Sequence, residues 1–147
     1  MLYFIVALGL TLALLRLTVI DLKTQRLPDH YTLPLIVVGL GLSLCDGGIG
    51  LRPSVIGGGV GFALFWAIGA FYFRRRGTEG LGLGDAKLFA ASGTWLGYLW
   101  LPYVLLIAAF GGLAFAILRR SETGRALAFG PWLALGFWGI WMVTSFW

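Results

Sequence analysis

Long apolar runs, separated by short polar or Gly/Pro breaks, make up most of this chain. A helix needs roughly 20 apolar residues to cross the hydrocarbon core of a bilayer, and a soluble protein rarely contains several such runs. With 59% hydrophobic and only 12% charged residues, we expect a single all-α transmembrane domain over residues 1–147. The runs predict six spans, near residues 1–20, 32–46, 54–73, 86–100, 102–118 and 130–147.

The basic residues mark alternate connections between these predicted helices. Nine of the eleven lie in three connections, and the other connections contain only Arg52. By the positive-inside rule the three basic connections are cytoplasmic, which puts both termini outside, as an even number of spans allows. The net charge of +5 is therefore explained by topology, and we expect no nucleic-acid partner. The nine are Lys23, Arg26, Arg74, Arg75, Arg76, Lys87, Arg119, Arg120 and Arg125.

Other residue types point to structure rather than chemistry. With one cysteine, Cys45, and one histidine, His30, the chain offers no internal disulfide and no Cys/His zinc cage, so we expect no metal or cofactor. Glycines in residues 57–61 and 93–97 are spaced for close helix packing in lipid. The seven tryptophans are predicted to anchor the helices at the membrane interface.

Two of the chain's carboxylates lie at the edges of predicted spans. Asp21 ends the first span and Asp85 opens the fourth, and the topology places both at the cytoplasmic edge, where they can meet. An ionisable group beside the apolar core is costly and is therefore a functional candidate. Two neighbouring carboxylates share one proton, so that one acts as base on a water and the other as acid toward a carbonyl. The pair thus predicts peptide hydrolysis, with Asp21 and Asp85 as catalytic residues.

Glycine alternates with other residues just before Asp85, over residues 80–84. Glycine permits backbone conformations and close approaches that side chains forbid. We therefore expect an extended substrate to lie against Gly82, Leu83 and Gly84. A glycine-rich turn followed by an aspartate helix cap would have the same sequence pattern, and the spacing does not distinguish the two interpretations.

Three segments of the chain resemble motifs of the type IV prepilin peptidases. Residues 21–34 look like the first active-site region of that family, Gly82-Leu83-Gly84-Asp85 looks like its GxGD motif, and Phe129-Gly130-Pro131 is similar to its FGP segment. The resemblance implies a GxGD aspartic protease fold of six helices in the bacterial inner membrane. It also implies that Asp21 and Asp85 remove the basic leader from type IV pilin or pseudopilin precursors at the cytoplasmic face.

The chain departs from the bifunctional members of that family in one respect. Those members carry an added N-terminal region whose cysteine-rich zinc site is associated with methylation of the new N-terminus. No such cysteines are present here, since Cys45 stands alone. The chain resembles a minimal form, or a piece of a longer protein, from which we expect cleavage without methylation.

Several other polar residues have simpler interpretations. Asp29 follows a proline and is predicted to cap the second span, and Lys87 is predicted to be an interface cation. His30 and Ser92 could suggest a serine peptidase dyad, but Ser92 lacks the G-x-S-x-G context, which favours small-residue packing. Glu79 and Glu122 are candidates to attract a basic leader.

Two other functions remain open from the residues alone. A small ion-coupled transporter or channel could use membrane aspartates, although it predicts an acidic residue near mid-membrane. A non-catalytic subunit of a pilus or secretion machine would use the aspartates only as helix caps. Oligomeric state is not indicated by the sequence.

Overall fold

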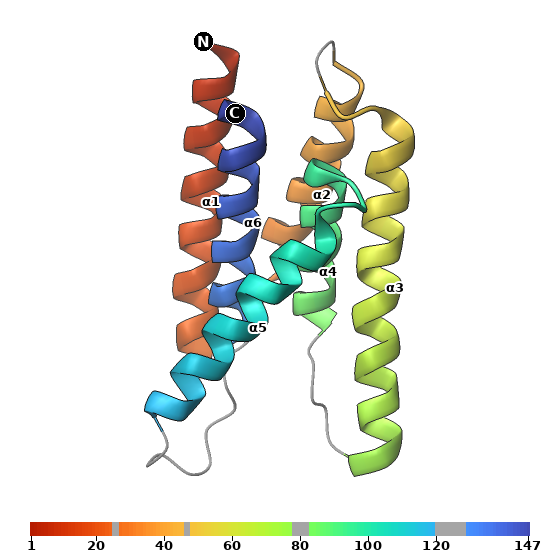
Figure 1. Ribbon diagram of the computed structural model, residues 1–147, viewed down its shortest axis with the longest axis vertical. Helices are drawn as coiled ribbons and strands as arrows, with labels where there is room; N and C mark the ends of the chain where they lie inside the picture. The colour runs from red at the N-terminus through yellow and green to blue at the C-terminus, as the bar shows by residue number, and fades with distance from the viewer. Residues whose placement is uncertain (25–26, 46–47, 78–82, 120–128) are drawn as a thin grey trace.

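The computed structural model describes residues 1–24, 27–45, 48–77, 83–119 and 129–147. Within this part of the chain, all regular structure is helical, and each helix matches one of the predicted spans (Figure 1). The prediction of an all-α protein with six helices is confirmed. The helices are α1 (Leu2–Thr24), α2 (Asp29–Ser43), α3 (Leu51–Arg76), α4 (Leu83–Leu96), α5 (Leu101–Leu118) and α6 (Gly130–Phe146).

The six helices differ in length and in their contact with the surroundings. Among the described residues, α1, α3 and α5 are long and apolar enough to cross a bilayer on their own. Helix α4 has only 14 residues, or about 21 Å at 1.5 Å per residue. Its side chains from Leu88 to Leu96 are all buried, so α4 lies within protein and its ends need not reach both lipid interfaces.

The helices form two groups that meet in the middle of the molecule. Helix α4 packs most extensively on α3 and α2, whereas α6 packs on α5 and α1. The main contact between the groups is that of α4 with α6. The N- and C-termini lie at the same end of the molecule (Figure 1), as an even number of spans requires.

Glycines make the contact between α3 and α4 unusually close. A Cβ atom on Gly57 or on Gly93 would collide with the backbone of the other residue, and one on Gly61 would lie 3.0 Å from the carbonyl oxygen of Phe89. Small residues of this kind allow helix backbones to approach in lipid, where apolar burial provides little drive for association. The predicted packing role is confirmed for Gly57, Gly61 and Gly93, whereas Gly59, in the same predicted set, has nothing within 4 Å of its Cβ position.

The tryptophan prediction is wrong for part of the set. Trp95 and Trp141 are buried in the core and pack edge to face, with ring centroids 5.9 Å apart. The indole N–H of Trp95 donates a 2.8 Å hydrogen bond to the carbonyl oxygen of Leu35 on α2. Trp95 therefore joins α4 to α2 and α6, because a buried indole must find an acceptor and the helix neighbours supply one.

Candidate active site

Asp21 lies near the end of α1, on the helix face that turns toward the other helices. The buried residues of α1 are Leu10, Leu14, Leu17 and Asp21, which recur at helical spacing along one stripe. Helix α1 continues to Thr24, beyond the predicted end of the span at residue 20. This extra turn carries the Asp21 side chain inward, and only 5% of the residue is exposed.

The carboxyl group of Asp21 lies against Gly130, the first residue of α6. A Cβ atom on Gly130 would stand 2.6 Å from Oδ2 of Asp21, so a side chain at this position would displace the carboxyl group. The backbone N–H of Gly130 also interacts with that carboxyl group. The N-terminus of a helix favours a carboxylate because its N–H groups and dipole present positive charge.

One oxygen of Asp21 has no hydrogen-bond partner in the described part of the chain. Among the described residues, no group hydrogen-bonds to the buried Oδ2 atom. Most buried polar atoms are paired, and an unpaired one calls for an explanation such as a catalytic role.

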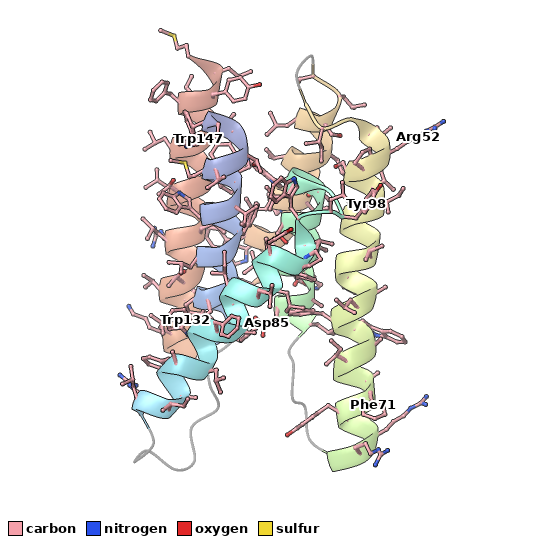
Figure 2. All side chains as sticks on the ribbon, viewed as in Figure 1. Arg52, Phe71, Asp85, Tyr98, Trp132 and Trp147 are labelled. Atoms are coloured by element: carbon pink, nitrogen blue, oxygen red, sulfur yellow. The ribbon has the colours of Figure 1, made fainter. Side chains whose placement is uncertain are left out.

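Asp85 lies in the first turn of α4, close enough to Asp21 for the two charges to interact. It is partly exposed, whereas Asp21 is buried. Helix α4 begins at Leu83, so Asp85 is inside the helix and does not precede it as an N-cap would. In Figure 2, Asp85 lies nearer to the middle of the molecule along its long axis than Phe71, which is close to the end of the much longer α3.

Two contacts join the start of α4 to the connection between α1 and α2. A Cβ atom on Gly84 would lie 2.7 Å from Cβ of Leu27, so the absence of a side chain allows the two segments to touch. Lys87 forms an ion pair with Asp29, with 2.6 Å between Nζ and Oδ1. These contacts fix the start of α4 beside the end of α1 and thus bring Asp85 toward Asp21.

The N-cap prediction for Asp29 is wrong. Pro28 is the N-cap of α2 and makes no side-chain capping hydrogen bond. Asp29 is the first residue of the helix, and its carboxylate reaches across to Lys87 instead. The ion pair links positions 58 residues apart, a separation at which sequence spacing alone gives no signal of contact.

The predicted substrate-binding residues differ in what the structure describes. Gly82 lies outside the described residues, as do Glu79 and Glu122. Leu83 is 59% exposed and opens α4. Gly84 is in contact with Leu27, so its missing side chain serves a contact within the protein. Binding of a substrate along this segment stays a prediction.

The predicted pairing of Asp21 with Asp85 therefore coincides with a structural junction of α1, α4 and α6. Comparison with known proteins then identifies the family of the chain. The profile of the Type IV leader peptidase family matches residues 8–117, which include both aspartates. The chain belongs to the type IV leader peptidase family.

Curated relatives of this family support the assignment along most of the chain. A prepilin leader peptidase/N-methyltransferase of Escherichia coli strain K12 is 46% identical over 125 residues, which are 83% of this chain and 56% of that protein. The protein of the same name from Neisseria gonorrhoeae is 40% identical over 145 residues, covering 94% of this chain and 51% of the relative. That from Pectobacterium carotovorum is 44% identical over 127 residues, covering 84% and 46%.

The chain spans about half the length of these curated relatives. No solved structure matches it. Membership of a membrane peptidase family, together with the apolar helices, identifies a multi-pass membrane protein.

The serine-dyad alternative finds no support in the geometry. Ser92 is buried within α4 and donates a 2.6 Å hydrogen bond to the carbonyl oxygen of Phe89, in the same helix. His30 is exposed on α2, where its ring lies beside that of Tyr31. Ser92 therefore serves helix packing, as predicted.

Proposed function

We propose that this chain hydrolyses the peptide bond that joins a basic leader to a type IV pilin or pseudopilin precursor. The observation that carries the proposal is the electrostatic interaction between Asp21 and Asp85, which lie on two different helices, and it is supported by the contact of Asp21 with Gly130. The relatives named as prepilin leader peptidases contain the matching region. Family membership favours hydrolysis over ion transport, the alternative that the residues alone leave open.

The two carboxylates act as a pair that holds a single proton. The ionised carboxylate takes a proton from a water molecule, whose oxygen attacks the carbonyl carbon of the scissile bond. The protonated carboxyl group gives its proton to the carbonyl oxygen, which produces a neutral tetrahedral intermediate. Collapse of this intermediate breaks the C–N bond: the proton taken from water passes to the leaving nitrogen, and a hydroxyl proton of the intermediate returns to the other carboxylate as the new carboxyl group forms. The buried Oδ2 of Asp21, with no protein partner among the described residues, suits contact with that water.

We further propose that the active site faces the cytoplasm of a bacterium, in the inner membrane. Lys23 lies in the last turn of α1, Arg74 and Arg75 lie in the last turn of α3, and Arg119 directly follows α5. These basic residues are at the same end of the molecule as Asp21 and Asp85. Arg52 lies at the opposite end, with the chain termini (Figure 2). The positive-inside rule then assigns the aspartates to the cytoplasmic side and both termini to the outside.

The direct experiment is leader cleavage by the purified chain in detergent, with type IV pilin precursors as substrates. The expected result is release of the leader by the wild-type chain and no release by Asp21→Asn. An ion-coupled transporter would instead move ions in proteoliposomes and leave every precursor intact. Precursors that stay uncleaved by folded wild-type protein would overturn the proposal.

A further inference from the structure

A groove of about 380 Å³ runs between α1 and α6. On α1 its lining residues are Thr11, Leu14, Leu15 and Thr18, and α6 contributes Pro131, Leu135 and Trp138 among others. The volume falls within the range of about 300–1,000 Å³ that is usual for sites that bind organic groups. Leu15 and Leu135 are exposed, and on membrane-spanning helices such side chains face lipid. The groove is therefore accessible from within the bilayer.

The groove leads to the catalytic pair. Its lining residues on α1 recur at helical spacing and share Leu14 with the buried stripe that ends at Asp21, which lies three residues after Thr18. On α6, the lining begins at Pro131, directly after the Gly130 that touches the Asp21 carboxyl group. Trp132, also part of the lining, lies at a height similar to that of Asp85 in Figure 2. One end of the groove thus lies about one helical turn from Asp21 on α1 and directly beside Gly130 on α6.

The chemistry of the groove selects an apolar occupant. Among the residues that the structure describes, its lining contains no charged side chain. The indole N–H of Trp138 donates to Oγ1 of Thr11, which in turn donates to the carbonyl oxygen of Ala7. Because these polar groups are already paired with one another, they offer little to a charged or strongly polar ligand.

We infer that this groove binds an apolar, membrane-embedded segment of the protein substrate, on one side of the bond that Asp21 and Asp85 cleave. The inference rests on the proposed peptidase function. A peptide seated in the groove reaches the aspartates at its end, so its next residues lie where the bond is hydrolysed. The groove then anchors the substrate in the bilayer and sets the position of the scissile bond. Continuity with Asp21 and Gly130 favours a peptide over a lipid acyl chain, which gains nothing from a site that ends at two carboxylates.

A tryptophan placed in the groove tests the inference. Leu15 lines the groove, whereas Leu12 does not, and the two are 57% and 56% exposed on the same helix. With the chain in proteoliposomes and a full-length type IV pilin precursor as substrate, Leu15→Trp is expected to lower kcat/KM at least tenfold, mainly through KM. Leu12→Trp, the matched control, is expected to change it less than twofold.

Photo-crosslinking supplies a readout that does not depend on turnover. A benzoylphenylalanine in place of Leu135, in the groove, is expected to capture the membrane-embedded segment of the precursor. The same probe in place of Val143, which is equally exposed on α6 but lies outside the groove, is expected not to do so. Capture of lipid alone at position 135 would overturn the inference.

The outcomes distinguish a failure of the groove assignment from a failure of the peptidase proposal. If the wild-type chain cleaves the precursor and both tryptophan variants cleave it equally well or equally badly, the groove assignment is wrong and the peptidase proposal stands. If folded wild-type chain cleaves no pilin precursor, the proposed function fails and the groove assignment fails with it.

Discussion

Gly130, the first residue of α6, lies directly against the carboxyl group of Asp21 near the end of α1. The contact joins the third of the recognisable motifs to the first, across more than a hundred residues of chain. It also places the N-terminus of a helix beside a carboxyl group, an arrangement that stabilises negative charge. The last helix therefore takes part in building the site, although it contributes no ionisable side chain to the described part of it.

Replacement of Gly130 by alanine should impair catalysis without unfolding the chain. The added Cβ atom would stand 2.6 Å from Oδ2 of Asp21, so the carboxyl group has to move. A displacement of about 1 Å in an active site can cost roughly a hundredfold in rate. We expect a loss of ten- to a hundredfold in kcat. Gly139→Ala is the control on the same helix, because nothing lies within 4 Å of its Cβ position; equal rates for the two variants would contradict the proposed contact.

A methyl group on Gly93 should destabilise the protein. Its Cβ atom would collide with the backbone of Gly57, which cannot rotate away as a side chain could. Overpacking of this kind costs about 1–3 kcal/mol, and we expect a lower midpoint of thermal unfolding in detergent for Gly93→Ala. Gly59→Ala, whose Cβ position is open, should be as stable as wild type or slightly more so, since alanine favours helix. A Gly93→Ala variant that melts at the wild-type temperature would refute the close α3–α4 contact.

Replacement of Asp29 by asparagine should leave most of the activity. The Asp29–Lys87 pair is partly exposed, with 58% and 24% of the two side chains accessible, and such pairs contribute about 0–1 kcal/mol. An asparagine at this position can still accept a hydrogen bond from Lys87. We expect at least a third of the wild-type kcat/KM in the leader-cleavage assay. Inactivation as complete as that of Asp21→Asn would instead make Asp29 part of the chemistry.

The proposed orientation can be tested with the single native thiol. Cys45 is free and exposed just beyond the end of α2, at the end of the helix that is opposite to the aspartates. An impermeant thiol reagent applied to intact cells should label it. Leu118→Cys in a Cys45→Ala background should react only after permeabilisation, because Leu118 is exposed at the other end of the bundle. The reverse labelling pattern would invert the topology.

The sequence predicts the helices and the two aspartates because both signals are local. An apolar run in lipid has to form a helix, because its backbone N–H and C=O groups find no water there to hydrogen-bond. A carboxylate at the edge of such a run can be recognised from the sequence alone. The contacts that assemble the site are not local. Nothing in the spacing of Gly130 indicates that it touches Asp21, and nothing around Asp29 indicates Lys87 as its partner. The sequence does not predict the core position of Trp95, because an indole inside a short predicted span fits the lipid interface as well as the protein core.

The central claim is that Asp21 and Asp85 act as one unit, and double-mutant kinetics test it most directly. Leader cleavage of a pilin precursor would be measured for wild type, Asp21→Asn, Asp85→Asn and the double variant, each at matched levels of folded protein. Groups that act together are strongly non-additive. We expect each single variant to lose about a thousandfold or more in kcat, and the double variant to be little worse than either. Cleavage at close to the wild-type rate by either single variant would contradict the account.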